Sequence, residues 1–545
     1  PLFDRFESWR KQQSRISYTD MLYDPVMAIR AYPQLEELVA NKMDILLVDE
    51  YQDTNDIQHE LLKFVAGTRA KITVVGDPDQ TIYEFRGANP DYIIHGFAKE
   101  FPEARSLSLS YSFRYGHKVS LLANHLISKN SGRQNLLCKS HPNNPSTQVY
   151  RHQSSDDPSE IVTLLSTKSI QELSQTAILA RVWSQTVGIE LALLEKNIPY
   201  HIDGYTGVFH SKETQSLRTL LELAAGQFES LPVELRQEKL DLLFHFPHVG
   251  LPDTQIKMVC ATLAQYPKDW GKQLLQSVPS DLKKIQTIKV ERLARALITA
   301  EHGKSTVQRL LVDYIDKTQL YEGIRSLSLS HDHAEEKIAS IQGVARFISQ
   351  REGDAQAILV HLDKLQSNAG KQHQHAVHLC TIHRAKGLEW DTVIIPGVNN
   401  KIMPYSYRSE TISALQLESE RRLLYVAMTR AKQQLHLLVP KPQKTGAPQN
   451  SRFEFELQFK QSIELGSCLD QQESAYKLTG NDKISLITQR YAEAMNCEVI
   501  KQENLQTDVS SKDSLTSLSD GNKEPVWFAT TVQHCVLGRG LVKGE

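Results

Sequence analysis

Two adjacent carboxylates, Asp49 and Glu50, follow directly on the apolar run at residues 45–48. Aliphatic β-forming residues in such a run predict a buried strand, and ionised groups at its end are unfavourable unless a cation uses them. In a parallel sheet that hydrolyses a nucleotide, the first carboxylate would hold Mg²⁺ and the second would polarise the attacking water. An isolated Asp-Glu pair more often marks a strand end whose acids face solvent, so the surrounding sequence decides between the two interpretations.

A second apolar run at residues 72–75 also ends in a polar cluster, at residues 76–88. The helical pattern of residues 56–66 between the runs predicts a β-α-β crossover, which makes the strands parallel and brings their carboxyl ends together. Gln80, in the polar cluster, is a candidate to orient a water molecule or to sense a γ-phosphate.

Tyr83 and Phe85 alternate with the charged residues Glu84 and Arg86. Aromatic rings presented in this way can stack on unpaired bases, whereas an aromatic pair in a core is rarely flanked by charges. The pattern therefore predicts a surface for single-stranded nucleic acid next to the carboxylate pair.

These runs resemble motifs II and III of the superfamily 1 DNA helicases, specifically the UvrD/Rep/PcrA family. Three later runs resemble motifs IV, V and VI in the same order: residues 109–115, 377–391 and 420–431. Runs that match in the family's order are highly specific, and the resemblance covers residues 1 to about 455. The sequence is therefore identified as a member of this family.

The resemblance implies an α/β fold with two RecA-like parallel-sheet motor domains, the first incomplete, and a helical 2B-type insertion in the second. Apolar residues at helical spacing after residue 212 agree with the insertion. The expected parts are the partial first motor domain (1–104), the first part of the second motor domain (105–212), the 2B-like insertion (213–372), the second part of the second motor domain (373–455), a polar extension and flexible linker (456–525), and a truncated Tudor-like segment (526–545).

The resemblance also assigns an ATP site whose residues come from both motor domains. Cationic side chains from the second domain match the charge that builds on a transferring phosphoryl group, and closure of the cleft between the domains would complete the site. The implied roles are Mg²⁺ binding through water (Asp49), general base (Glu50), γ-phosphate contact (Gln80), arginine fingers (Arg114 and Arg430), adenine stacking (Phe113) and ribose binding (Glu389).

On the DNA side, the resemblance implies that Tyr83 and Phe85 stack on bases of single-stranded DNA. Arg86 would bridge the DNA-facing and phosphate-facing sides of motif III, and Thr381 and His383 would contact the DNA backbone or relay its presence. Phe85 stands where the family usually has Trp.

The family's phosphate-binding loop, GxxxxGK[ST], has no counterpart in this sequence. The nearest imitation is at residues 303–306, where Ile298 replaces the first glycine and residues 290–300 read as helix. Gly303 is better explained as a helix end, and Ser305 or Thr306 as the next N-cap. We therefore expect a fragment that lacks the start of the first motor domain, and that is inactive alone.

Composition sets weaker bounds. Lys and Arg total 62 against 64 Asp and Glu, which gives a net charge of −2, so a DNA path must be a local groove. The 6 cysteines are scattered without a CxxC pair, which indicates reduced thiols. With no membrane-length apolar run or signal peptide, the expected location is the cytoplasm, in association with the nucleoid.

Two histidine groups, residues 331–333 and the set His373, His375 and His378, are interpreted as solvated loops rather than metal sites. The predicted function is an ATP-dependent 3′→5′ DNA helicase of repair or replication restart. It would act on single-stranded DNA and single-strand/duplex junctions, with repair or transcription proteins as possible partners. The alternatives are a non-hydrolysing DNA-binding remnant and a RecB-type helicase–nuclease, which the lack of a downstream carboxylate–lysine set disfavours.

Overall fold

The computed structural model describes residues 2–204, 207–277, 282–303, 305–369, 375–405, 412–441, 450–478, 483–501, 531–534 and 538–541. The chain divides into two compact units, Pro1–Ile500 and Lys501–Glu545. Within the described residues, no helix is both long enough and apolar enough to cross a membrane.

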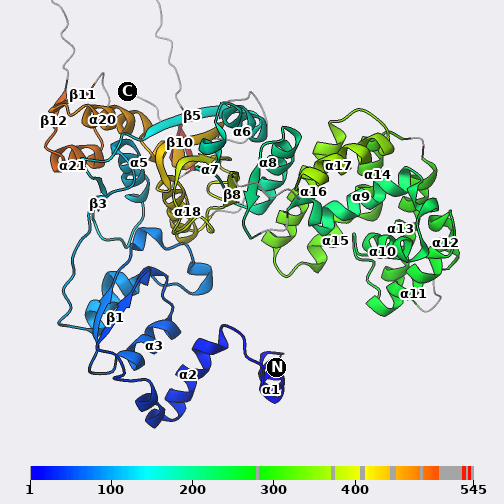
Figure 1. The fold of residues 1–545 in the computed structure, drawn as a ribbon, viewed down its shortest axis with the longest axis horizontal. Helices are drawn as coiled ribbons and strands as arrows, with labels where there is room; N and C mark the ends of the chain where they lie inside the picture. The colour runs from blue at the N-terminus through cyan, green and yellow to red at the C-terminus, as the bar shows by residue number, and fades with distance from the viewer. Residues whose placement is uncertain are drawn as a thin grey trace, which may run out of the picture. The chain divides into compact units, whose positions relative to one another are not determined.

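The first part of the chain forms the predicted β-α-β unit (Figure 1). Strands β1 (Ile45–Val48) and β2 (Lys71–Val74) pair in parallel, and α3 (Asp56–Ala66) connects them. A capping box between Asn55 and Gln58 begins α3 by satisfying backbone N–H groups. The neighbouring helices are α1 (Leu2–Gln12), α2 (Asp20–Ala31), η1 (Pro33–Leu38), η2 (Tyr51–Asp53), η3 (Pro78–Gln80), η4 (Glu84–Arg86), η5 (Tyr92–Gly96) and α4 (Phe97–Glu100).

The prediction that β1 is buried is wrong for the described chain. Ile45 is 63% exposed and Leu47 is 77% exposed. Alternate residues of a strand share one face, and β1 has only β2 as a partner in its sheet. One face of this two-stranded sheet therefore remains open, although the carboxyl ends of the strands still meet.

A six-stranded parallel sheet forms the centre of the next part. Its strand order is β5-β10-β9-β6-β8-β7, so the sheet combines three strands from before the helical insertion with three from after it. The apolar run of β6 is buried throughout, as expected for a sheet covered on both faces. The strands are β5 (Gln148–Ser154), β6 (Thr176–Ala180), β7 (Tyr200–Ile202), β8 (Val377–Thr381), β9 (Trp390–Ile395) and β10 (Ala431–Pro440).

Helices and one small sheet accompany these strands, and together they confirm the predicted α/β class. The short strands β3 (Tyr111–Ser112) and β4 (Lys139–Ser140) pair in parallel. The helices are α5 (His117–Ile127), α6 (Asp157–Ser166), α7 (Ile170–Ser174), α8 (Trp183–Glu195), η6 (Val208–His210) and α18 (Ala414–Met428).

The insertion is helical, as the green helices of Figure 1 show. Its buried apolar residues form one core cluster together with Val187, Leu191 and Leu194 of α8. Residues 303–306 behave as predicted, since Gly303 ends one helix and the Thr306 side chain caps the next. The helices are α9 (Lys212–Ala224), η7 (Gln227–Ser230), α10 (Val233–Phe244), α11 (Asp253–Ala264), α12 (Trp270–Gln276), α13 (Lys284–His302), α14 (Val307–Thr318), α15 (Leu320–Leu327), α16 (His331–Ser349) and α17 (Ala355–Ala369).

The expected polar extension is wrong for residues 456–500, which form packed elements. Leu465 and Tyr491 pack against Leu121 of α5 in one buried cluster, and the Tyr491 hydroxyl lies 3.0 Å from Nδ1 of His117. The apolar residues are too widely spaced along the sequence to reveal this cluster. The elements of this part of the chain are α19 (Arg452–Glu456), α20 (Phe459–Asp470), β11 (Ala475–Leu478), α21 (Leu486–Ala494) and β12 (Glu498–Lys501).

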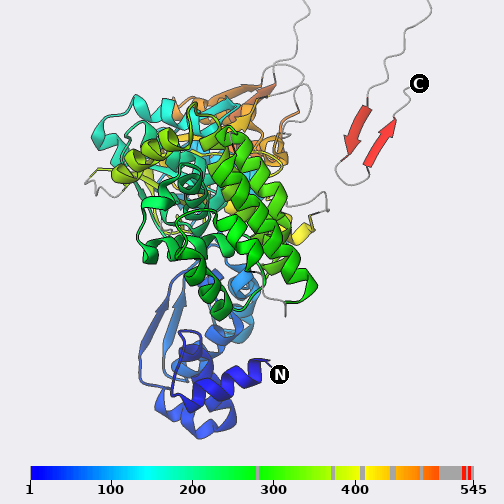
Figure 2. The ribbon, with the colours of Figure 1, turned by 90° about the vertical axis from the view of Figure 1, so that its right-hand side faces the viewer.

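The predicted linker at 502–525 lies outside the described residues. In the second unit, β13 (Thr531–His534) and β14 (Gly538–Leu541) pair antiparallel, as the red strands of Figure 2 show. This is the pairing expected of a hairpin, and the Tudor-like assignment stays a prediction.

Candidate active site

The carboxylate pair lies at the carboxyl end of β1, at the mouth of a pocket. Asp49 and Glu50 are both exposed, and the Glu50 backbone N–H donates to Asp49 Oδ1 at 2.8 Å. Glu50 has φ of 52°, a left-handed conformation that a non-glycine residue adopts at a cost of about 1–3 kcal/mol. Such strain is common at functional sites, and here it turns the chain sharply after β1. The pocket is lined by Val48, Asp49, Glu50, Tyr51, Asp53, Thr54, Gln58 and Leu62.

Lys386, to which the sequence had given no role, reaches this pocket from the turn after β8. Its side chain is 6% exposed, and its Nζ lies 2.5 Å from Asp53 Oδ2 and 3.3 Å from Glu50 Oε2. The same ammonium donates to the backbone oxygen of Gln80 at 2.9 Å and lies 5.4 Å from the ring centroid of Tyr83. Lys386 thus connects the carboxylates to the aromatic residues that follow β2.

Burial raises the pKa of Asp53, and the Lys386 ammonium opposes that rise. Without Lys386 the folded-state pKa of Asp53 would lie still further above its unfolded value. The stability contributed by a carboxyl group with a raised pKa is lost as the pH rises through that pKa. We therefore expect Lys386→Met to lower the melting temperature more at about pH 8 than at about pH 5.

A thermal melt of each variant across this range checks the expectation. The double variant Asp53→Asn/Lys386→Met should remove the added pH dependence and recover about 0.5–3 kcal/mol relative to the sum of the single changes. Equal destabilisation by Lys386→Met at both pH values would contradict a charge interaction.

Arg430 lies between α18 and β10 and is 2% exposed. Its Nη2 donates to Gln80 Oε1 at 2.9 Å, and its other nitrogens donate to the backbone oxygens of Val426 and Leu388 at 3.1 and 3.3 Å. Within the described ranges, no carboxylate forms an ion pair with it. Burial and the nearby Arg114 charge lower the pKa of Arg430 to about 10, so the guanidinium stays cationic at neutral pH.

A buried guanidinium without a carboxylate is unfavourable by itself. Its planar donors match phosphate oxygens, and Gln80 is already hydrogen-bonded to it. The structure thus brings together the predicted Gln80 and Arg430, which are 350 residues apart in sequence.

Arg114 and Glu389 are also brought together, as partners of one another. Arg114 Nε donates to Glu389 Oε2 at 2.5 Å, and Arg114 Nη1 donates to the backbone oxygen of Thr429 at 3.2 Å. The Arg114 guanidinium is the main cause of the lowered pKa of Glu389, and Lys432 Nζ lies 3.7 Å from the same carboxylate. Arg114 is therefore next to Arg430, but it would have to share or leave Glu389 to contact a phosphate.

Phe113 presents its ring for stacking. It is 74% exposed, and one side of the ring stacks on His141 with centroids 4.6 Å apart and planes at 28°. Nothing in the sequence had pointed to a role for His141. It supports Phe113 from one side and leaves the other side open to a planar base.

The predicted DNA-binding residues divide into a surface group and a buried one. Phe85 is 70% exposed, its ring meets that of His383 edge-on at 5.7 Å, and the Arg86 guanidinium lies 5.4 Å from its centroid. Tyr83 is half-buried and donates its hydroxyl to the His383 backbone oxygen at 2.9 Å. We call these four residues (Tyr83, Phe85, Arg86 and His383) the aromatic platform.

Thr381, by contrast, is 6% exposed at the end of β8 and offers little surface for a DNA contact. Burial lowers the pKa of His383 to about 4, so its imidazole is neutral at neutral pH. In this arrangement His383 therefore contributes ring contact rather than charge to the platform.

Further contacts, unforeseen in the sequence, hold the segment after β2 against α18 and the loop after α5. Arg422 Nη1 donates to Glu84 Oε1 at 2.7 Å, and the Arg133 guanidinium binds Asp79 at 2.5 Å. Ile82 is buried in the core around the six-stranded sheet. These contacts position Gln80 and the aromatic platform against the second domain.

Among the described residues, neither of the two histidine groups considered in the sequence forms a cluster of possible metal ligands. Residues 331–333 lie in the first turn of α16 rather than in a loop, because Ser330 caps that helix. His378 lies on β8, and His373 lies outside the described residues.

Comparison with known proteins matches both halves of this site. Residues 107–441 match the UvrD-like helicase C-terminal domain, and residues 2–102 match the UvrD/REP helicase N-terminal domain. The corresponding RecA-like motor domains are thus both represented.

Curated relatives agree with these matches. YjcD of Bacillus subtilis is 28% identical over 84% of this chain and 59% of its own length. The ATP-dependent DNA helicase PcrA of Staphylococcus epidermidis is 26% identical over 79% of this chain and 60% of its own length. The ATP-dependent DNA helicase Rep of Buchnera aphidicola is 24% identical over 80% of this chain and 68% of its own length. The chain spans about 60% of the length of the first two of these relatives. It belongs to the UvrD-like helicase family.

Proposed function

We propose that this chain is the motor part of an ATP-dependent 3′→5′ DNA helicase that couples ATP hydrolysis to movement on single-stranded DNA. The observation that carries the proposal is Arg430, a buried cation without a carboxylate partner in the described structure, hydrogen-bonded to Gln80. A terminal phosphate of ATP would supply the missing negative charge. The names of the relatives PcrA and Rep support DNA as the substrate.

The donor set fits ATP with Mg²⁺. Asp49 and Glu50 present carboxylate oxygens at an open pocket, which suits a hard, hydrated cation. Mg²⁺ would neutralise phosphate charge there. Glu50 would accept the proton of the attacking water, Gln80 would orient that water, and Arg430 and Arg114 would stabilise the charge that builds on the transferred group.

The site is assembled from the segment after β1 and β2 and from the domain with the six-stranded sheet. Lys386 contacts Glu50 on one side and the ring of Tyr83 on the other. Nucleotide-driven closure would therefore shift the aromatic platform along DNA, because the two sites share this side chain.

Single-stranded-DNA-stimulated ATP hydrolysis tests the proposal. Because the sequence contains no GxxxxGK[ST] loop, we expect no turnover by these 545 residues alone. Turnover should appear in a version of the chain extended by a segment with that loop. If the 545 residues alone hydrolyse ATP and Glu50→Gln abolishes that turnover, the site is supported and the expected need for this loop is overturned.

The second candidate is a non-hydrolysing protein that binds single-stranded DNA, and the absent loop motif is the observation that favours it. DNA binding by the aromatic platform with no turnover in the extended version would support this candidate.

The direction of travel proposed for the helicase is tested by unwinding of duplexes with 3′ or 5′ single-stranded tails. We propose further that the helicase acts at single-strand/duplex junctions in DNA repair or replication restart. In this proposal it also binds repair or transcription proteins and is associated with the nucleoid.

Phe85→Ala is expected to weaken binding of single-stranded DNA by about 1–3 kcal/mol, because one base would lose its stacking surface. Fluorescence anisotropy of a labelled oligonucleotide at fixed salt measures this change without ATP. Phe455→Ala is a matched control, since Phe455 is 71% exposed on α19, outside the platform. Equal affinities of the two variants would argue against the platform as the DNA site.

A further inference from the structure

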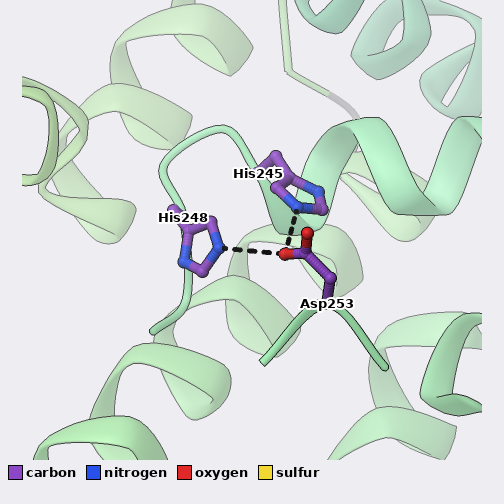
Figure 3. Close-up of side chains that lie close together, drawn as sticks. All are labelled: His245, His248 and Asp253. Atoms are coloured by element: carbon purple, nitrogen blue, oxygen red, sulfur yellow. Dashed lines mark ion pairs between the residues drawn. The ribbon is translucent and has the colours of Figure 1, made fainter. Parts of the chain in front are cut away.

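Two imidazoles and a carboxylate meet in the turn between α10 and α11, far in sequence from the ATP site. His245 follows the end of α10, His248 lies in the turn, and Asp253 begins α11. Figure 3 shows the three side chains directed at one another. Asp253 Oδ1 lies 3.6 Å from His245 Nε2 and 4.0 Å from His248 Nε2, and one ligand atom from each residue lies within 4.8 Å of the others.

The turn that carries these residues is anchored in the core of the insertion. Phe246, Val249 and Leu251 are 6%, 2% and 4% exposed. The Tyr314 hydroxyl donates to the Phe246 backbone oxygen at 2.5 Å. The histidines therefore project from a fixed backbone rather than from an unsupported loop.

His245 has the orientation of a metal-binding histidine. Its Nδ1 lies 2.8 Å from the backbone oxygen of Asp241 and 3.5 Å from the Asp241 carboxylate. An Nδ1–H that donates to this oxygen leaves the Nε2 lone pair directed at the cluster. The ring is thus held in the tautomer that a metal at Nε2 requires.

We propose that His245, His248 and Asp253 bind one divalent transition-metal ion of the zinc class, with a fourth position open to water. Imidazole nitrogens suit Zn²⁺, Co²⁺ and Ni²⁺, whereas Mg²⁺ and Ca²⁺ prefer oxygen ligands throughout. Tetrahedral zinc with bonds of about 2.0–2.2 Å places neighbouring ligand atoms roughly 3.3–3.6 Å apart. The observed spacings need only small side-chain movements to reach this geometry.

The competing interpretation is a hydrogen-bonded His–Asp–His group without metal. The Gly250 N–H donates to His248 Nδ1 at 2.9 Å, so in this arrangement the His248 proton is on Nε2 and faces Asp253. Metal binding would move that proton to Nδ1 and release the Gly250 N–H. Gly250 is exposed, so water can accept this hydrogen bond at small cost.

Metal titration of the untagged 545-residue chain, after dialysis against a chelator, distinguishes the metal site from the metal-free His–Asp–His group. We expect one Co²⁺ per chain with the visible absorption of a tetrahedral site, displaced by one Zn²⁺, and a Zn²⁺-dependent rise in melting temperature. His245→Ala and His248→Ala should each weaken binding by more than about 10-fold. Asp253→Asn preserves shape and should also weaken it, while circular dichroism checks that each variant is folded.

His302→Ala is the matched control, because His302 is a partly exposed histidine of the same insertion that pairs with Asp269 instead. It should leave the affinity unchanged. Absence of saturable one-ion binding, or equal binding by a His245→Ala/His248→Ala double variant, would overturn the site. A thiolate-to-cobalt charge-transfer band would place the ion on cysteines and would overturn it as well. None of these outcomes depends on ATP hydrolysis.

Discussion

Arg430→Ala is expected to lower single-stranded-DNA-stimulated ATP turnover by about 10³-fold or more, as loss of an arginine finger does. Turnover is measured in the version of the chain extended by a phosphate-binding loop. The loss should appear in kcat, because the guanidinium meets charge that develops only in the transition state. DNA affinity without nucleotide should stay unchanged, because Arg430 does not touch the aromatic platform.

Stability separates this role from a structural one. Arg430 is buried without a carboxylate partner in the described residues, so its removal relieves an uncompensated charge but also opens a cavity and frees the backbone oxygens of Val426 and Leu388. Because these effects oppose one another, Arg430→Ala should lower the melting temperature less than the loss of a buried, paired arginine does. Arg421, on the neighbouring helix α18, is buried and paired with Glu456 at 2.7 Å. Arg421→Ala should cost about 3–5 kcal/mol of stability and leave turnover per folded molecule largely intact.

The opposite pattern would contradict the assignment. If Arg430→Ala destabilised the fold as much as Arg421→Ala while its folded fraction kept normal turnover, the hydrogen bond to Gln80 would be a structural tie between domains. Arg430→Lys gives an intermediate test, since it keeps the charge and loses the planar fork of donors.

The β-α-β unit could be predicted from sequence because local patterns determine it. The apolar runs at β1 and β2, the helical spacing of α3 and the capping pair Asn55–Gln58 all act over short distances. The roles proposed for Gln80 and Arg430 at the ATP site came from ordered motifs, since each residue lies inside a recognisable run. The hydrogen bond between Gln80 and Arg430 was not predicted, because the order of the motifs does not specify which side chains contact one another.

Features that depend on long-range packing had no local signal. Lys386 looks like any lysine in a polar turn until the fold places it beside Asp53 and Glu50. The exposure of Leu47 depends on which strands join β1, which its own sequence cannot specify. The cluster around Asp253 likewise requires the turn after α10 to fold back on the start of α11.

Glu50→Gln is expected to reduce DNA-stimulated turnover in the extended version by about 10²–10⁴-fold, the usual worth of a positioned general base. The substitution is nearly isosteric. The amide oxygen can still accept from the Gln52 side chain, which donates to Glu50 Oε2 at 2.5 Å, so the strained turn after β1 should persist. Nucleotide and DNA should therefore still bind, and ATP should remain uncleaved in the site.

The pairing with Lys386 makes this result diagnostic. Glu50 lies 3.3 Å from the Lys386 ammonium, so the loss of its charge could act by disturbing that contact rather than by removing a base. Lys386→Met removes the same ion pair and keeps the Glu50 carboxylate. If the carboxylate is the base, Lys386→Met should retain far more turnover than Glu50→Gln in rapid-quench single-turnover measurements. Equal losses in the two variants would assign the effect to the ion pair. Glu60→Gln on α3 is the control for the loss of a carboxylate elsewhere in the domain.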